Sequence, residues 1–569
     1  MKIIKTTIKL NFNTYPSSYT SKINTPTMTR CLLSVAIASS LLLVGCGDDN
    51  NDNTTNVTYA TTVEPINSFT ANDINNIISA GVAAPEAKCD IKIEKVTYQT
   101  EGSAGEITNA TAALMLPSGG GADCQGDRPI LLYAHGTTTD KNYDFSQVGN
   151  PSNPAVGEAS LIAANFAAQG YIVVAPNYAG YDDSELSYHP YLVADQQSAD
   201  MVDALDSARS IIDQQQSDSV TNVDDSGELF ISGYSQGGHV AMATARLLES
   251  QNKPVTAIAP LSGPYALAAF GDAIFAGNVN IGATRFAPLL ATGLQKKYGD
   301  IYTSPSEIFT DDYANTQLPS MLSFDQLVAA KQLPEFALFQ RAPTNNPIID
   351  GLTPSELPFA VIGFDDNKYL IKNVFRAAYL ADAGQNPDRL LAKTGVLPAV
   401  TPRNGLRKAL KDNDLRGYVP KMPTLLCGGH RDPTVFYDLN TGSMIAILRQ
   451  ANVDLEANLN ITVLDVDNDS EAGRGIPTLL PISPSAVANP WLRNMTISNI
   501  QTSFTDTVNA VQTSAFTKAK LAGLTDAEAQ QAAGAAFLAS YHGGLVSTAC
   551  TQATREFFEQ NFNNLQPPV

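Results

Sequence analysis

Residues 227–250, GELFISGYSQGGHVAMATARLLES, contain the pattern that decides the fold. An apolar run leads into Gly233-Tyr234-Ser235-Gln236-Gly237, and apolar residues at helical spacing follow it. This pentapeptide is a G-x-S-x-G sequence, which composition alone would produce about 0.2 times in a chain of this length. Its position between a strand and a helix is what a nucleophile elbow requires, because the sharp turn holds the serine hydroxyl clear of the sheet. We therefore expect Ser235 to be a nucleophile.

The surrounding sequence alternates short apolar runs with amphipathic stretches. The runs expected to be strands are 90–100, 107–117, 130–134, 171–175, 228–232, 255–259, 424–427 and 460–464. The stretches expected to be helices between them are 158–169, 191–212 and 236–249. This alternation predicts a mostly parallel sheet with helices on both faces.

Two interruptions of the alternation suggest the domain organisation. We expect residues 63–262 to form the first part of the core, 263–420 a large inserted helical cap, and 421–569 the second part of the core. A second insertion, about 466–524, has a loop-like composition and contains Trp491. The alternative, in which an interruption forms an independent second domain, stays open.

A serine nucleophile needs a base, and the five histidines of the chain can be compared one by one. In enzymes with this type of elbow, the acid and then the histidine follow the serine along the chain. His135 and His189 precede Ser235, and His239 lies within the helix that follows it. His430 comes only two residues before the best acid. His542 remains and is the predicted base.

The acid is expected after the strand 424–427, in the loop Gly428-Gly429-His430-Arg431-Asp432-Pro433. Asp432 is therefore the predicted partner that orients the His542 ring. Asp438, Asp465 and Asp467 are alternatives.

Two backbone amides are expected to form an oxyanion hole. One is the N–H of Gln236, directly after the nucleophile, and the other is assigned to Thr137 in the loop after the strand 130–134. The Thr137 hydroxyl is a candidate third donor. His135, at the start of this loop, is then expected to have a structural role.

The N-terminus predicts export. Arg30 precedes an apolar run, 31–44, that is too short to cross a bilayer but fits a signal peptide. The run ends in Leu43-Val44-Gly45-Cys46, which resembles a bacterial lipobox. Residues 1–45 are thus expected to be a leader, with translation starting at Met1 or Met28. Residues 46–62 are expected to be a flexible tether lipidated on Cys46, at the outer membrane, in the periplasm or at the cell surface.

Four cysteines remain after such processing, which favours two disulfides in an exported protein. Three connectivities are possible, and we favour Cys89–Cys124 with Cys427–Cys550. The second bridge would join the loop of the predicted acid to the loop of the predicted histidine.

The charge balance excludes one class of function. The formal net charge is −20, so the chain repels nucleic-acid phosphates, and no basic stripe offsets this repulsion.

The segments YAHGT, GYSQGG, CGGHRD and YHGG, in this order, resemble the fungal–bacterial secretory lipase family of α/β-hydrolases, over about residues 89–555. The resemblance implies an esterase or lipase with a cap over the site, acting on a small-molecule or lipid ester without metal or organic cofactor. Two alternatives remain: a serine peptidase of the same fold, and a non-catalytic binding lipoprotein. We expect the cap to form the acyl pocket and to open as a lid.

Overall fold

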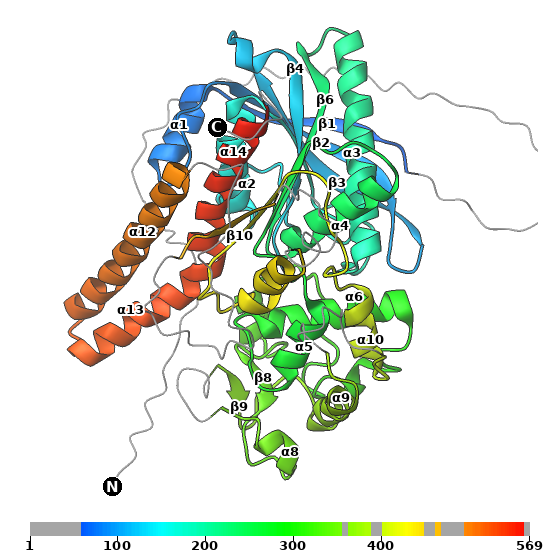
Figure 1. Ribbon diagram of the computed structural model, residues 1–569, viewed down its shortest axis with the longest axis vertical. Helices are drawn as coiled ribbons and strands as arrows, with labels where there is room; N and C mark the ends of the chain where they lie inside the picture. The colour runs from blue at the N-terminus through cyan, green and yellow to red at the C-terminus, as the bar shows by residue number, and fades with distance from the viewer. Residues whose placement is uncertain (1–58, 355–361, 389–400, 449–460, 468–493, 563–569) are drawn as a thin grey trace, which may run out of the picture. The chain divides into compact units, whose positions relative to one another are not determined.

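The computed structural model describes residues 59–354, 362–388, 401–448, 461–467 and 494–562 (Figure 1). The predicted leader, Cys46 and most of the predicted tether lie outside these residues, and so does Trp491.

Within the described residues, nine strands form one sheet in the order β1-β2-β3-β5-β4-β6-β7-β10-β11. The strands β1, β2, β3 and β5 pair antiparallel, and every pair from β5–β4 to β10–β11 is parallel. The bounds are β1 Thr62–Phe69, β2 Asp90–Glu101, β3 Ile107–Ser118, β4 Gly126–Ala134, β5 Ile172–Pro176, β6 Val223–Tyr234, β7 Ala257–Leu261, β10 Thr424–Gly428 and β11 Ile461–Asp465. The predicted mostly parallel sheet is confirmed. Strand β1 was not predicted, and it begins at the last residue of the predicted tether.

Helices cover both faces of the sheet (Figure 1). Helices α3 and α4 pack against each other and against the central strands on one face, whereas α2 and α14 lie together on the other. The bounds of these helices and of α1 are α1 Ala71–Ser79, α2 Val156–Asn165, α3 Ala194–Ser217, α4 Gln236–Ser250 and α14 Ser547–Phe562.

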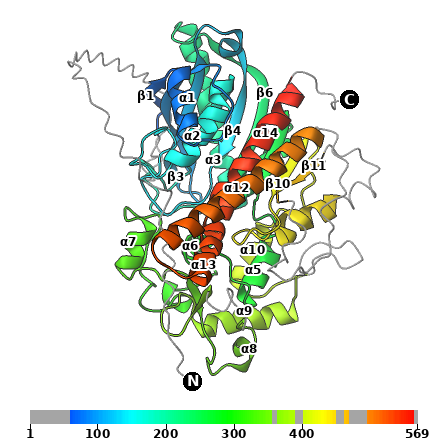
Figure 2. The same ribbon diagram turned by 90° about the vertical axis from the view of Figure 1, so that its left-hand side faces the viewer.

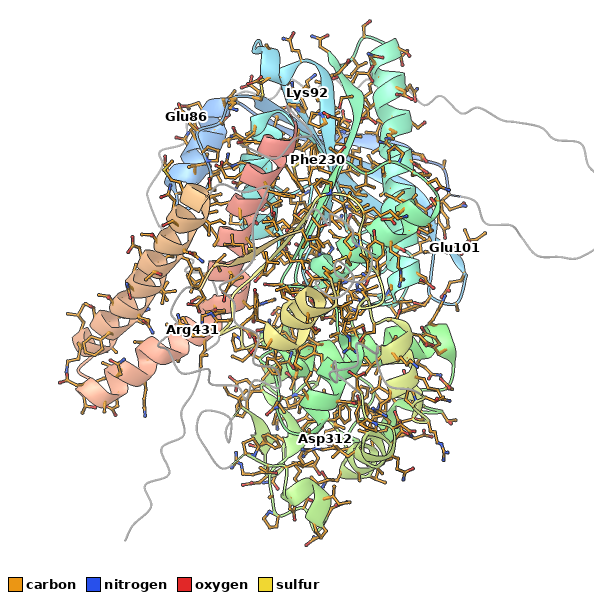
Figure 3. The ribbon with its side chains drawn as sticks, viewed as in Figure 1. Glu86, Lys92, Glu101, Phe230, Asp312 and Arg431 are labelled. Atoms are coloured by element: carbon orange, nitrogen blue, oxygen red, sulfur yellow. A yellow bond between two sulfur atoms is a disulfide. The ribbon has the colours of Figure 1, made fainter. Side chains whose placement is uncertain are left out.

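The buried core lies between the central strands and the helices on both faces of the sheet. All five residues of β5 and of β7 are buried, as expected for central parallel strands. Phe230 of β6 packs against Phe558 of α14, with ring centroids 4.7 Å apart (Figure 3). The C-terminal helix is therefore part of the core on which the central strands depend.

The chain between β7 and β10 forms mostly helices and a two-stranded parallel sheet of β8 and β9. The bounds are α5 Leu267–Phe275, α6 Ala283–Tyr298, α7 Phe324–Ala329, β8 Ala337–Gln340, α8 Pro347–Asp350, β9 Gly363–Asp365, α9 Asn373–Gln385 and α10 Gly405–Asp412. These elements share an apolar cluster of their own, separate from that of the main sheet. We call the segment 263–420 the cap.

Two helices follow β11: α12 Asn494–Leu521 and α13 Asp526–Ser540, which pack against each other (Figure 2). The prediction that 466–524 is loop-like is therefore wrong for 494–521. Ile500, Phe504 and Val508 are buried at a spacing of four residues, but the serine, threonine and aspartate residues between them weaken the helical signal. No described helix is long and apolar enough to cross a bilayer.

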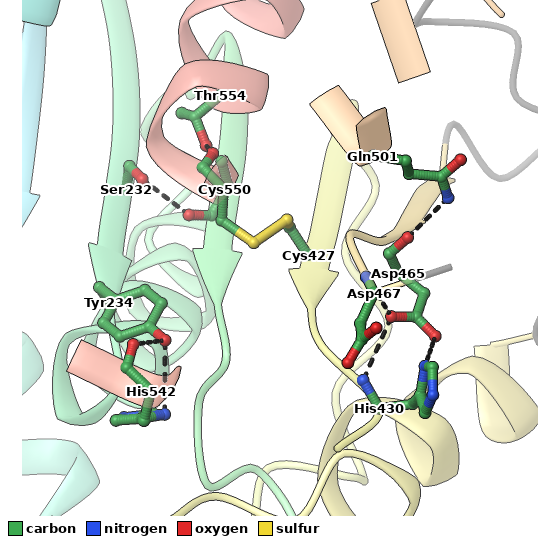
Figure 4. The surroundings of a disulfide bond; sticks show 11 residues. Ser232, Tyr234, Cys427, His430, Asp465, Asp467, Gln501, His542, Cys550 and Thr554 are labelled. Atoms are coloured by element: carbon green, nitrogen blue, oxygen red, sulfur yellow. Dashed lines mark hydrogen bonds and ion pairs between the residues drawn. A yellow bond between two sulfur atoms is a disulfide. The ribbon is translucent and has the colours of Figure 1, made fainter. Parts of the chain in front are cut away.

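Both predicted disulfides are present, Cys89–Cys124 and Cys427–Cys550. The second joins the end region of β10 to α14 across a sequence separation of 123 residues (Figure 4). It therefore fixes the C-terminal helix to β10, the strand next to the edge strand β11.

Replacing both Cys427 and Cys550 by serine should lower the free energy of unfolding by about 2 to 5 kcal/mol, because the bridge restricts a long loop in the unfolded chain. Urea unfolding of the oxidised wild type and the variant measures this difference. An unchanged transition midpoint would show that the bridge does not constrain the unfolded state.

Candidate active site

The turn between β6 and α4 places Ser235 at the carboxyl edge of the sheet. Ser235 has φ +59° and ψ −120°, a conformation that L-residues rarely adopt, and its N–H donates to Leu261 O of β7 at 2.9 Å. A non-glycine residue held there stores strain, which is common at functional sites. The side chain is only 8% exposed.

Glycines make this turn possible because the chain passes close to the end of β4. A Cβ on Gly237 would lie 1.8 Å from Ala134 O, and one on Gly233 would lie 2.3 Å from Gly237 O. Ala134 is paired with Gly233 in the parallel register of β4 and β6. The glycines of the pentapeptide therefore bring the elbow against the strand that leads into the predicted oxyanion loop.

A chain of hydrogen bonds runs from Ser235 through His542 to Asp432. The Ser235 Oγ lies 2.8 Å from His542 Nε2, and His542 Nδ1 lies 2.6 Å from Asp432 Oδ2. Since a carboxylate can only accept, Nδ1 carries the proton and Nε2 is free to accept the serine proton. The structure thus brings together the three residues that we predicted to form the triad.

Asp432 is held by its own loop. Its Oδ1 accepts the N–H groups of Thr434 at 2.8 Å and Val435 at 3.1 Å, and its side chain is 1% exposed. These two bonds hold Oδ1 in place and leave Oδ2 for the histidine. Two of the three alternative acids have other partners: Asp465 bonds His430 at 2.8 Å, and Asp467 bonds Arg431 at 2.5 Å. The third, Asp438, begins the π-helical turn Asp438–Gly442.

His542 lies in a π-helical turn, Tyr541–Val546, between α13 and α14. Turns of this kind are rare and concentrate at functional sites. The phenol of Tyr234, the residue before Ser235, donates to His542 O at 2.5 Å (Figure 4). The backbone of the predicted base is thereby attached to the residue before the predicted nucleophile, and no pattern in the sequence indicated this contact.

The predicted oxyanion donors lie on adjacent strand ends. Gln236 is the first residue of α4, so its N–H has no acceptor within that helix. Thr137 follows β4, and its Oγ1 lies 3.0 Å from the hydroxyl of Tyr191. The N–H of Gly136, next to Thr137, donates to the buried carboxylate of Glu158 at 3.0 Å. No sequence pattern pointed to Glu158 or Tyr191, and the donor roles of Gln236 and Thr137 stay predictions.

Three other histidines are buried, and burial keeps them neutral. Their pKa values are lowered to about 4 for His135, about 3 for His189 and about 4 for His239. His135 Nε2 lies 3.1 Å from Asn177 O, and His239 Nε2 lies 2.9 Å from Asn413 O. Neither imidazole ring is hydrogen-bonded to the Ser235 hydroxyl among the described residues, and for His135 this agrees with the structural role that we predicted.

The fifth histidine, His430, pairs with Asp465 and lies two residues before Asp432. Partial burial of the His430 ring acts to lower its pKa, but the hydrogen bond and the charge of Asp465 oppose this, so the pKa of His430 is raised above its ordinary value.

An apolar cavity opens beside Ser235 and extends into the cap. Among the described residues that line it, none is charged, and the polar ones are Tyr191, Ser235, Gln236 and Asn280. Most of the lining comes from the cap helices, for example Phe270, Phe275, Phe286, Leu290, Phe375 and Leu410. This surface suits an apolar group of a substrate whose reactive atom lies at Ser235.

The structure is similar to that of the rice cell wall degrading esterase LipA from Xanthomonas oryzae. For its ligand-bound form the TM-score is 0.55, at 26% identity over 71% of this chain and 89% of that chain. A Legionella pneumophila protein described as a hydrolase has a TM-score of 0.50, at 20% identity over 71% of this chain and 91% of its own. No protein family and no curated protein matches the sequence.

The fold is that of the α/β-hydrolases. The likeness to the esterase supports a hydrolase that acts on carboxylic esters. The narrower resemblance to the secretory lipase family stays a prediction.

A variant of His239 should make stability less sensitive to acid. Because the folded pKa, about 4, lies below the unfolded value of 6.5, the unfolded chain takes up the proton first as the pH falls. The stability associated with this group is therefore present above about pH 6.5 and is lost between about 6.5 and 4. Between pH 7 and pH 5 the wild type should lose about 2 kcal/mol more than His239→Gln.

Urea unfolding at both pH values measures this double difference, in which any general effect of the substitution cancels. Equal losses in the two proteins would show that His239 is not held neutral.

Proposed function

We propose that the protein is a serine carboxylic-ester hydrolase in which Ser235 is the nucleophile, His542 the general base and Asp432 the acid. One observation carries this proposal: the uninterrupted hydrogen-bond chain from Ser235 Oγ through the His542 ring to Asp432. Such a chain converts a weakly nucleophilic hydroxyl into a reactive one.

In the first half of the reaction, Ser235 Oγ attacks the ester carbonyl carbon while His542 Nε2 takes the hydroxyl proton. The negative charge then develops on the former carbonyl oxygen, where the N–H groups of Gln236 and Thr137 are the proposed donors. His542 returns the proton to the alcohol oxygen as the carbon–oxygen bond breaks, which leaves an acyl-enzyme.

In the second half, His542 takes a proton from water, whose oxygen attacks the acyl carbon. Collapse of this second intermediate returns the proton to Ser235 Oγ and releases the acid. Asp432 accepts the hydrogen bond of Nδ1 throughout and stabilises the imidazolium, which needs the close contact of 2.6 Å between Nδ1 and Oδ2.

The cavity favours an ester over a peptide as substrate. A peptidase of this fold would need a charged group to hold a peptide terminus, but the described lining residues are uncharged. For an acyl chain, in contrast, each methylene buried in the cavity makes binding more favourable by about 0.8 kcal/mol. We propose that the acyl part of the substrate lies in the cap side of this cavity.

We also propose that the enzyme is a lipoprotein, anchored to a membrane through Cys46. The support is the sequence: a short apolar run ends in Leu43-Val44-Gly45-Cys46, and a polar segment follows. Several acyl chains on one cysteine would hold the enzyme firmly, whereas a single chain would not.

The wild type should hydrolyse p-nitrophenyl esters, and Ser235→Ala should lose at least about 10⁴-fold in kcat/KM, because the nucleophile cannot be replaced. Release of p-nitrophenol from a series of acyl lengths measures this and gives the preferred chain. Since the cavity is apolar, kcat/KM should rise with acyl length until the cavity is filled.

The result that contradicts the proposal is retention of ester hydrolysis by Ser235→Ala. If neither protein acts on any ester but the wild type cleaves peptides, the peptidase alternative holds.

When the full chain is expressed in a bacterium that processes lipoproteins, the wild type should fractionate with membranes and Cys46→Ser should not. The matched control is Cys31→Ser, which changes a cysteine inside the apolar run and leaves the expected lipid site intact. Labelling with a radioactive fatty acid should follow the same pattern. Membrane fractionation of Cys46→Ser at the wild-type level would reject the anchor.

A further inference from the structure

Two tyrosines stand directly before residues of the proposed triad. Tyr234 precedes Ser235 and Tyr541 precedes His542, and their side chains are 3% and 0% exposed. Neither lies among the described residues that line the cavity beside Ser235. Their phenol groups are therefore placed to act on the protein and not on a substrate.

Tyr234 joins the nucleophile segment to the histidine segment. Its hydroxyl donates to His542 O at 2.5 Å, and its oxygen lies 3.4 Å from His542 Nδ1 (Figure 4). The two rings also contact each other, with centroids 5.0 Å apart. Since Tyr234 is the last residue of β6, this bond fixes the His542 backbone to the central strand of the sheet.

Tyr541 joins the histidine segment to the acid segment in the same manner. Its hydroxyl accepts the N–H of Arg431, the residue before Asp432, at 3.1 Å and donates to Asp467 Oδ2 at 2.6 Å. Asp467 also binds the Arg431 guanidinium, at 2.5 Å from Nε and 2.8 Å from Nη2. The backbone and side chain of Arg431 are thus both attached to the Tyr541–Asp467 pair.

Packing around the Tyr541 phenol shows that little movement is possible. A Cβ on Gly429 would lie 2.5 Å from the phenol oxygen, so the acid loop approaches Tyr541 as closely as glycine permits. Phe504 of α12 and Phe537 of α13 contact the Tyr541 ring edge to face. The Arg431 guanidinium lies 5.0 Å from the Phe537 ring centroid, beside α13 (Figure 3).

From these contacts we infer that Tyr234 and Tyr541 are positioning residues, whose hydroxyls hold the three segments of the triad in register. Each hydroxyl bonds the backbone of the next segment: Tyr234 that of His542, and Tyr541 that of Arg431. The inference rests on the proposed function, since it assigns a role in the Ser235–His542–Asp432 chain. Loss of either bond frees one segment to shift, and a shift of about 1 Å in a reacting group can reduce the rate 100-fold.

The test compares Tyr234→Phe and Tyr541→Phe with a matched control, Tyr98→Phe. Tyr98 is also fully buried and its hydroxyl donates to a buried carboxylate, that of Asp200, at 2.7 Å. It lies on β2, in the antiparallel part of the sheet away from the triad. All three substitutions therefore remove one buried hydroxyl and should lower the melting temperature by similar amounts.

The first measurement is the rate at which a fluorophosphonate probe labels Ser235. In this reaction the serine oxygen displaces fluoride from phosphorus, so the rate reports activation of the serine without any need for the natural ester. Tyr234→Phe and Tyr541→Phe should be labelled about 10- to 100-fold more slowly than the wild type, and Tyr98→Phe within about twofold of it. Rates are compared on the monomeric folded fraction from gel filtration.

The second measurement separates kcat from KM with a p-nitrophenyl ester. Because neither phenol lines the cavity, kcat should fall in both variants while KM stays within about twofold of the wild type. If Tyr541→Phe does not fold, Asp467→Asn takes its place, since this variant removes the carboxylate that accepts the hydrogen bond of the phenol.

Each tyrosine is judged by its own variant. Labelling at the rate of Tyr98→Phe, or an increase in KM at constant kcat, overturns the positioning role but leaves the proposed function standing. A wild type that the probe does not label at Ser235 overturns the proposed function and this inference together.

Discussion

The constraint on which the site depends is the backbone conformation of Ser235. With φ +59° the chain reverses between a buried strand and a buried helix, and it does so against the carbonyl of Ala134 because Gly233 and Gly237 have no side chains. The same turn starts α4, so the N-terminal end of this helix, where the helix dipole is positive, directly follows Ser235. Because β4, β6, β7 and β10 are parallel, their carboxyl ends meet at one edge, and the loops after β4 and β10 come to the elbow. Strain at one residue and parallel pairing together determine where a base and an acid can be placed.

The base and the acid come from distant parts of the chain, 307 residues from Ser235 to His542 and 110 from Asp432 to His542. Contacts over such separations close very long loops. The free energy that they contribute must therefore offset the loss of chain entropy on closing those loops. The structure concentrates cross-links there: the Cys427–Cys550 disulfide, the Arg431–Asp467–Tyr541 cluster and the Tyr234–His542 bond. The insertion of α12 and α13 before His542 is compatible with this arrangement, because both helices pack onto the ring of Tyr541.

The parts of the fold that the sequence predicts are those with local causes. The elbow combines glycine spacing with a strand and a helix in one short stretch, and the order of acid and histidine along the chain then selects Asp432 and His542. Strand β1 was missed because almost all of its residues are exposed on an edge strand, so no apolar alternation marks it. Helix α12 was missed because only every fourth residue needs to be apolar when one narrow face is buried. The roles of Tyr234, Tyr541 and Glu158 depend on which segments meet, and a single sequence contains no record of that.

The side chain of Gln236, whose backbone N–H is a proposed oxyanion donor, contacts His189, a buried and neutral histidine. His189 donates through Nδ1 to Ala179 O and stays neutral, so its Nε2 can only accept, and the Gln236 side-chain amide lies 2.6 Å from it. The side-chain amide of Gln236 must therefore point its nitrogen at His189. This hydrogen bond holds Gln236, whose backbone N–H is the proposed donor, in place. A protonated His189 would instead present a donor to that nitrogen and break the contact. Burial that keeps His189 neutral thus preserves the orientation of the Gln236 side chain, and the amides of the proposed oxyanion site would need no reorganisation as charge develops on a substrate.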